Sequence, residues 1–194
     1  SELSGDMFAA EEQAKARAAL HNQLGQVLLM GRHYLSHPES TDPKLVYLTT
    51  RQMNRFLLGE AEEPRAEEQD ELSEAVRMAK SIGVTVQING EAPQEAQIRG
   101  IIAQTITECA ANTVKHAEGN RLTAELSERE SGFLAVITNS GKPPKRPVAE
   151  SGGLLSLRRK IEAAGGTMNI ESDPAFALSL QIPRKEKPER SEFI

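Results

Sequence analysis

Apolar positions in the first third of the chain recur at the spacing of an α-helix. Between Met7 and about Ser36 they form one seam, and no proline interrupts it. The prolines between His37 and Pro43 predict a turn, after which a second amphipathic helix extends to about Gly59. Two antiparallel helices cannot cover both apolar faces by themselves. The pattern therefore predicts a homodimer in which two helical hairpins form a four-helix bundle.

The rest of the chain mixes helical and strand periodicities. The acidic, proline-containing stretch from Glu60 to Asp70 is predicted to be a linker. Beyond it we expect helices over 71–82, 95–117 and 154–164, and strands over 84–88, 121–128, 133–138, 167–171 and 176–182. Helices segregated against a mixed sheet indicate the α+β class. The predicted divisions are a helical hairpin over 1–62, an α+β domain over 63–184 and a charged tail over 185–194.

Composition narrows the classes of function. The 194 residues carry 23 basic and 28 acidic side chains, and a net charge of −5 gives no bulk attraction for nucleic acid. A single cysteine, Cys109, excludes an internal disulfide and fits a reducing, cytoplasmic compartment. No apolar run reaches the length of about 18 residues that a membrane span needs. The chain starts with Ser1 rather than Met, so we expect that a membrane-anchored sensory part could precede it.

Candidate chemistry is concentrated between Ile106 and Ala117. Glu108, Asn112 and His116 recur every fourth residue and would stack on one face of a helix, opposite an apolar stripe. Carboxylate and carboxamide oxygens suit Mg²⁺, which keeps waters and phosphates as its other ligands. Lys115, beside this row, could face a phosphate. On spacing alone, an ordinary amphipathic helix explains the row at least as well.

Two later stretches add to this picture. A predicted strand delivers Asn139 into a loop, where Gly141 allows a turn or a close approach to a ligand. Gly152 and Gly153 directly precede the predicted helix that begins at Leu154. Free N–H groups and the positive end of a helix dipole suit phosphates. Each stretch taken alone is weak evidence for a ligand site.

Together, and in this order, the three stretches resemble the ATP-binding domain of sensor histidine kinases. The stretches read E-C-A-A-N-T-V-K-H-A, T-N-S-G and S-G-G-L-L-S-L-R-R-K-I-E-A-A-G-G, and the resemblance extends from about Glu71 to Pro183. It implies a Bergerat-type α/β sandwich, shared with gyrase and MutL, that binds ATP and Mg²⁺. Asn112 would hold the metal, Asn139 would bind the adenine amino group, and residues 142–151 would form a short lid over the phosphates. The resemblance assigns the remaining nucleotide-binding roles to Lys115, His116, Gly141, Gly152, Gly153 and Leu154.

The first helix extends the resemblance. L-H-N-Q-L-G-Q, from Leu20 to Gln26, is similar to the phosphoacceptor motif of the kinase subfamily related to nitrate and lipid-fluidity sensors. This implies that His21 accepts the γ-phosphoryl group of ATP and passes it to an aspartate of a response regulator. Gln26 would orient the water that dephosphorylates the regulator, and Glu108 would orient the metal or its waters.

Four departures from the family pattern leave other functions open. Asn22 replaces the acidic residue that should act as base for His21, and Asn139 replaces the adenine-binding Asp. Pro143 and Ser151 stand where glycines are usual. One alternative is therefore a kinase-like scaffold that binds nucleotide or a regulator without efficient turnover. Another is a serine kinase that antagonises a transcription factor, although such proteins would lack the hairpin that carries His21.

Overall fold

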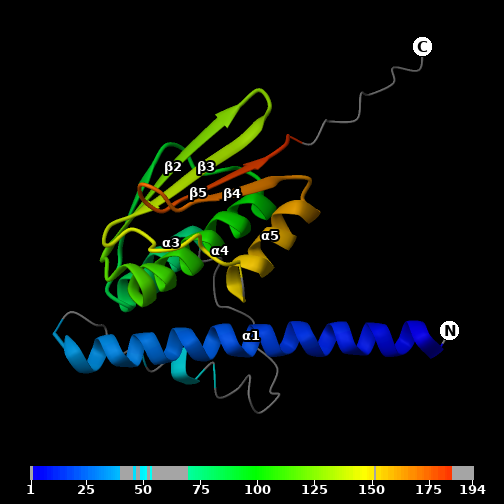
Figure 1. Ribbon diagram of the computed structural model, residues 1–194, viewed down its shortest axis with the longest axis horizontal. Coiled ribbons are helices and arrows are strands. Elements are labelled where there is room, and N and C mark those ends of the chain that lie inside the picture. Colours follow the sequence, from blue (N-terminus) through cyan, green and yellow to red (C-terminus); the bar gives the residue numbers. More distant parts are fainter. Residues whose placement is uncertain are drawn as a thin grey trace.

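The computed structural model describes residues 2–39, 46, 49–51, 53, 70–150 and 152–184. Its first element, α1 (Glu2–Ser36), is a long helix that lies alongside a separate layer of helices and a sheet (Figure 1). The helix starts five residues earlier than predicted. Most of the second predicted helix, the predicted linker and the charged tail lie outside the described residues, so the hairpin stays a prediction.

The sheet has five strands, and each matches a predicted strand to within two residues at either end. They are β1 (Thr85–Asn89), β2 (Arg121–Arg129), β3 (Gly132–Asn139), β4 (Thr167–Glu171) and β5 (Ala177–Ile182). Their order is β1-β2-β3-β5-β4. β1 runs parallel to β2, with Thr85 opposite Arg121, and every other pair is antiparallel. The sheet is therefore mixed, as the sequence predicts.

Three helices cover one face of this sheet (Figure 1). They are α3 (Glu71–Ser81), α4 (Ala96–Asn112) and α5 (Gly153–Ala163). The core between the layers is mostly aliphatic, and Cys109 is fully buried in it, where burial raises the pKa of the thiol to about 12. The predicted apolar stripe of Ile102, Ile106, Ala110, Thr113 and Ala117 is buried in the same core. The α+β class is confirmed.

The prediction of one continuous α-helix over 95–117 is wrong at its end. α4 ends at Asn112 and continues as a π-helical turn, η1 (Thr113–Ala117). The Thr113 hydroxyl donates to the carbonyl of Cys109 at 2.7 Å, and Glu118 ends the turn in a left-handed conformation with φ of 52°. His116 therefore lies in this π-turn, beyond the end of the α-helix that carries Glu108 and Asn112.

The apolar seam of α1 is only partly covered. Met30 is 1% exposed and belongs to the core of the α+β domain, so α1 is packed against that domain. In contrast, Leu24, Leu28 and Leu35 are 44%, 63% and 82% exposed. Within the described part of the chain, these three leucines are therefore covered only in part.

Candidate functional site

A cavity of about 850 Å³ lies between α1, the end of α4 with η1, and the loop that leads from β3 to α5. It brings together all of the predicted site residues except Gly141, from five segments of the chain. These residues are His21, Asn22, Gln26, Glu108, Asn112, Lys115, His116, Asn139, Gly152, Gly153 and Leu154. The predicted phosphoacceptor and the predicted ATP-binding residues therefore face one common space.

Glu108 of α4 lines this cavity and lies close to residues of both α1 and α5. Asn22 of α1 donates its Nδ2 hydrogen to Glu108 Oε1 at 3.4 Å. A Cβ atom added to Gly153 would lie 1.8 Å from Glu108 Oε2, so a side chain there would displace the carboxylate from the start of α5. Burial raises the pKa of Glu108, and the nearby ammonium of Lys115 acts in the opposite direction. Glu108 thus joins α1, α4 and α5 around one buried carboxyl group.

The start of α5 and the loop before it suit a phosphate group. Gly152 has a φ of +54° and precedes a helix whose N-terminal N–H groups have no side-chain cap. Among the cavity-lining residues, Lys115, Lys142, Lys145 and Arg146 are cationic. Free N–H groups and cations together favour an anionic ligand with several oxygens.

Asn112 is the predicted metal ligand. It is half-buried at the last position of α4 and lines the cavity with its neighbours Ala111 and Lys115. Among the described residues, no cluster of three or more His, Cys, Asp or Glu side chains could hold a metal by itself. One carboxamide oxygen fits Mg²⁺ that takes its remaining ligands from phosphates and water. The donor set therefore fits a metal carried in with a nucleotide.

Asn139 is oriented by a residue whose role the sequence did not reveal. Its Nδ2 donates to Thr113 Oγ1 at 3.1 Å, and Thr113 in turn donates to the Cys109 carbonyl. This hydrogen bond fixes the orientation of the Asn139 carboxamide. The side-chain oxygen of Asn139 is then the atom available to accept a hydrogen from an amino group. Spacing placed Thr113 in the apolar stripe, where it is indeed fully buried, but spacing alone could not reveal its bond to a loop residue.

Gly141 lies behind the cavity rather than in its lining. It has a φ of +103°, and a Cβ atom there would lie 2.3 Å from the carbonyl oxygen of Ala117. The next residue, Lys142, donates its backbone N–H to that same oxygen at 2.7 Å. Glycine is required here because the loop passes directly over η1. The residue places the loop, and its predicted role in nucleotide binding stays a prediction.

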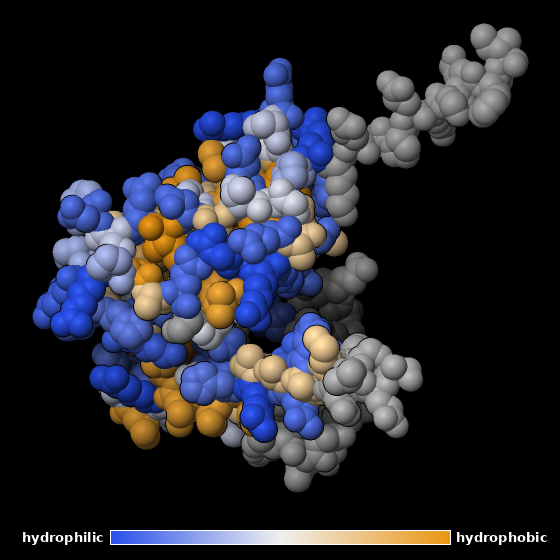
Figure 2. Space-filling view, turned by 45° about the vertical axis from the view of Figure 1, so that its right-hand side comes forward, coloured by the Kyte–Doolittle hydropathy of each residue, from blue (hydrophilic) through white to orange (hydrophobic). Residues whose placement is uncertain are grey.

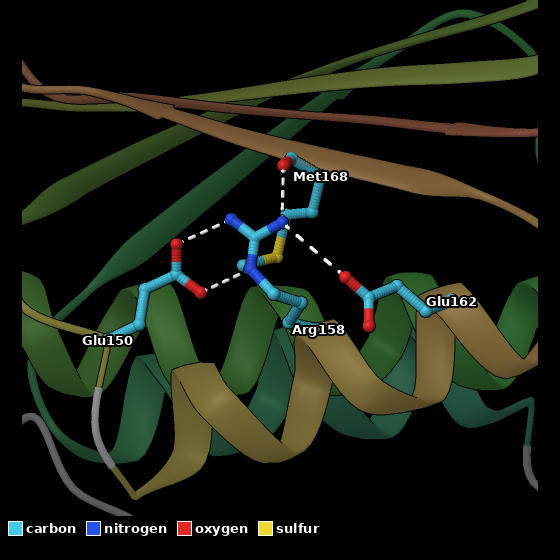
Figure 3. Close-up of polar contacts among 4 residues, drawn as sticks. All are labelled: Glu150, Arg158, Glu162 and Met168. Atoms are coloured by element: carbon cyan, nitrogen blue, oxygen red, sulfur yellow. Dashed lines mark hydrogen bonds and ion pairs between the residues drawn. The ribbon is translucent and has the colours of Figure 1, made fainter.

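The far end of the same loop is held by an ion-pair network (Figure 3). Arg158 of α5 donates from Nε and Nη2 to the two carboxylate oxygens of Glu150, and from Nη1 to the Met168 carbonyl at 2.8 Å. Glu162 lies 3.9 Å from Nη1. The hydrogen bonds from Arg158 lower the pKa of Glu150. Sequence reasoning missed this pair because its members flank a glycine turn and follow no periodic spacing.

Comparison with known proteins finds sequence similarity to sensor proteins. No protein-family model matches the chain. It is 22% identical over 89 residues to the sensor histidine kinase DesK of Bacillus subtilis, a match covering 45% of this chain and 24% of DesK. It is 31% identical over 77 residues to the sensor protein VraS of Staphylococcus saprophyticus, covering 39% of this chain and 22% of VraS. The chain thus matches about a quarter of the length of these curated relatives, and the predicted resemblance to sensor histidine kinases is confirmed.

Two solved structures are also similar in outline. The ATP-binding domain of PrrB from Mycobacterium tuberculosis is 21% identical, with a TM-score of 0.46, and the match covers 60% of this chain and 93% of that one. The histidine kinase domain of the blue-light activated kinase EL346 from Erythrobacter litoralis is 12% identical, with a TM-score of 0.44, and the match covers 90% and 94%. In the described part of the chain, no helix has the length and apolar character to cross a membrane.

Proposed function

We propose that this chain is the catalytic portion of a two-component sensor histidine kinase, which uses ATP and Mg²⁺ to phosphorylate His21. The observation that carries the proposal is the common cavity, in which His21 faces the residues of all three ATP-binding motifs. The matches to DesK and VraS, whose names identify them as sensor proteins, support the same class of function.

The cavity offers one place for each part of the nucleotide. The Asn139 oxygen accepts a hydrogen from the adenine amino group, since Thr113 already holds the Asn139 nitrogen. The phosphates lie towards Lys115 and the start of α5 at Gly153 and Leu154. His116, which is exposed on η1, lies on the phosphate side. Mg²⁺ bound through Asn112 would neutralise charge on the phosphates as the transfer proceeds.

The reaction transfers one phosphoryl group. A ring nitrogen of His21 attacks the γ-phosphorus of ATP, the bond from that phosphorus to the β,γ-bridging oxygen breaks, and ADP leaves. The ring loses its N–H proton to water, because Asn22 can orient the imidazole by accepting a hydrogen bond but cannot take the proton away. Glu108 holds Asn22 in place through the 3.4 Å hydrogen bond and orients water or metal near Asn112.

The phosphoryl group then passes to an aspartate in the receiver domain of a response regulator. Gln26, which lines the same cavity one turn beyond Asn22, orients the water that removes the group from the regulator again. We assign residues 1–62 to dimerisation and phosphotransfer, 63–184 to ATP binding and 185–194 to a charged tail. The active unit is a homodimer located in the cytoplasm.

Labelling with γ-³²P ATP and Mg²⁺ tests this proposal. The chain should acquire an acid-labile, base-stable label, as phosphohistidine does. His21→Gln and Asn112→Asp should each lose the label, whereas His37→Gln, on an exposed residue outside the cavity, should keep it. Label that persists in His21→Gln would contradict the assignment of the acceptor.

A second candidate function is a scaffold that binds nucleotide or a regulator without efficient turnover. The observation that favours it is Asn22, whose side chain carries no charge and is engaged by Glu108. A positioned base is worth about 10²–10⁴-fold in rate. We therefore expect Asn22→Asp to speed phosphohistidine formation at least about tenfold, measured as a time course.

The new carboxylate would also lie close to Glu108 and repel it. The double variant Asn22→Asp/Glu108→Gln separates that repulsion from the effect of the base. If both variants stay at the rate of the unmodified chain, the missing base does not limit the reaction. Tight nucleotide binding without any label in any variant would favour the scaffold.

A further inference from the structure

We infer that phosphoryl transfer takes place within one chain: the ATP bound by a given α+β domain phosphorylates His21 of the same chain, even in a dimer. The inference rests on the proposed function and specifies how its site is assembled. It follows from three features, namely the register of α1 against η1, the face of α1 that carries His21, and the core contact that fixes α1 on its own domain.

The register of α1 is fixed by two contacts at the cavity. Asn22 donates to Glu108 at 3.4 Å. One turn further along α1, a Cβ atom at Gly25 would lie 3.7 Å from the ammonium nitrogen of Lys115. The close approach at Gly25 brings α1 against the residue that is predicted to face the phosphates. Both contacts join residues of one chain.

His21 lies on the same face of α1 as Gly25. Residues four apart stack on one side of a helix, about one turn or roughly 5.4 Å apart. Because Gly25 faces Lys115, the His21 ring projects towards the same phosphate end of the cavity. The ring is exposed and lines the cavity, so it needs no rearrangement to become accessible. A γ-phosphate bound at Lys115 therefore lies within about one helical turn of the imidazole.

The docking of α1 extends beyond the cavity. Met30, two turns past Asn22, is 1% exposed and is part of the hydrophobic core of the α+β domain. A buried apolar anchor, one hydrogen bond and one close approach along about two turns of helix define one orientation of α1. The acceptor is thus presented to the ATP-binding residues of its own domain.

Reciprocal heterodimers test the inference. Two differently tagged chains are co-expressed and purified by both tags, and then incubated with γ-³²P ATP and Mg²⁺. In the first heterodimer, one chain carries His21→Gln and the other carries Asn112→Asp. In the second, an unmodified chain is paired with a chain that carries both substitutions. Transfer within a chain predicts no label in the first heterodimer and normal label on the unmodified chain of the second.

Transfer between chains predicts the reverse pattern, with label on the Asn112→Asp chain of the first heterodimer and none in the second. That result would overturn the inference and leave the proposed function intact. Absence of label in the unmodified homodimer would instead overturn the proposed function, and with it this inference. If the chain does not dimerise, a labelling rate per chain that is unchanged on tenfold dilution supports transfer within the chain.

Cross-linking gives a measurement that does not depend on kinase activity. Gly25→Cys/Lys115→Cys places two thiols across the contact, while the native Cys109 is fully buried. A short bismaleimide should join them in a mixture of ¹⁴N- and ¹⁵N-labelled chains to give peptides of a single isotope. The control, Ala18→Cys/Lys115→Cys, uses the same face of α1 about 10 Å further away and should react far less. Mixed-isotope peptides, or equal reaction of both pairs, would contradict the docking.

Discussion

At the scale of single residues, the buried carboxyl group of Glu108 makes the stability of the domain depend on pH. Burial raises its pKa above the ordinary value of 4.5, so the folded chain holds this proton more tightly than the unfolded chain. The stabilisation of the folded chain by this bound proton is complete below pH 4.5, and it is lost as the pH rises through the raised pKa of Glu108. Above the raised pKa, the ionised group therefore carries a desolvation cost.

We expect Glu108→Gln to be more stable than the unmodified chain at pH 7 and nearly equal to it at pH 4. The glutamine oxygen still accepts the hydrogen bond from Asn22 and carries no charge to desolvate. Thermal unfolding should show a Tm about 2 °C or more higher at pH 7. Glu118→Gln is the control: the ion pair with Lys142 lowers the pKa of this exposed carboxylate, so its removal should bring no gain. A Glu108→Gln chain that is less stable at pH 7 would contradict the account.

The residue types of the site could be predicted, but their partners could not. Glu108, Asn112 and Asn139 stand out because their order and neighbours resemble a known motif. The bond from Asn22 to Glu108 joins residues 86 positions apart, and only the packing of α1 on the domain creates it. Likewise, the space that Gly153 leaves for Glu108 depends on how α5 meets α4.

At the scale of elements, the π-helical turn η1 connects the end of α4 to Asn139, the last residue of β3. Thr113 makes both connections, one to the Cys109 carbonyl and one to Asn139. Apolar periodicity predicted every described helix and strand, because burial on one side imposes the period directly. It did not predict the π-turn, because Thr113 and Ala117 fit the apolar stripe of a continuous α-helix equally well. The predicted row of Glu108, Asn112 and His116 therefore extends from α4 into η1.

We expect Thr113→Val to weaken nucleotide binding about tenfold, the loss of roughly 1.4 kcal/mol that one hydrogen bond can supply. Without the hydroxyl, Asn139 loses the partner that orients its oxygen. Thr105→Val is a matched control, because Thr105 is equally buried and bonds to the Ile101 carbonyl at the same 2.7 Å. Calorimetry with a non-hydrolysable ATP analogue should show weaker affinity only for Thr113→Val. Equal affinities for both variants would remove Thr113 from the adenine site.

The Glu150–Arg158 pair fixes the end of the loop next to Gly152 (Figure 3). Arg158 lowers the pKa of Glu150, so the contribution of the pair is present above the ordinary value of 4.5 and is lost as the pH falls through the lowered pKa. We expect Arg158→Met to cost about 1 kcal/mol at pH 7. The cost should shrink steadily in acid.

Chemical denaturation at pH 7 and pH 3 measures this effect. Arg159→Met, on the exposed neighbouring position, should change stability little at either pH. A second readout is nucleotide affinity, which should fall when the loop end is released beside the start of α5. A cost that is the same at both pH values would show that packing of the Arg158 stem, rather than the ion pair, stabilises the loop.

At the scale of the whole molecule, the exposed leucines of α1 indicate an interface. Leu24, Leu28 and Leu35 lie on a helix that is covered by the domain only in part. Figure 2 shows apolar side chains gathered along the lower edge of the molecule, where Figure 1 places α1. A second copy of the helix is the cover that the four-helix bundle predicts, although most of the second predicted helix lies outside the described residues.

We expect Leu28→Glu/Leu35→Glu to convert the dimer into a 21.2 kDa monomer. Two charges in an apolar seam would each lose hydration on association, without a partner to compensate. Sedimentation or light scattering at micromolar concentration measures the change. Leu155→Glu, on an apolar residue of α5 that is 36% exposed, should leave the mass unchanged. An unmodified chain that is already monomeric would contradict the predicted bundle.

The cavity has one wall from α1 and the other from the α+β domain, and this has a thermodynamic consequence. A nucleotide that touches both walls binds the docked arrangement more tightly than an undocked one. By linkage, docking of the helix must then raise nucleotide affinity by the same factor by which nucleotide favours docking. A signal that rotates or withdraws α1 would thus lower the affinity for nucleotide, even though the signal makes no contact with the adenine end of the site. Docking of the first helix therefore affects the nucleotide site of its own domain as the binding of an allosteric ligand would, although the helix is covalently part of the chain.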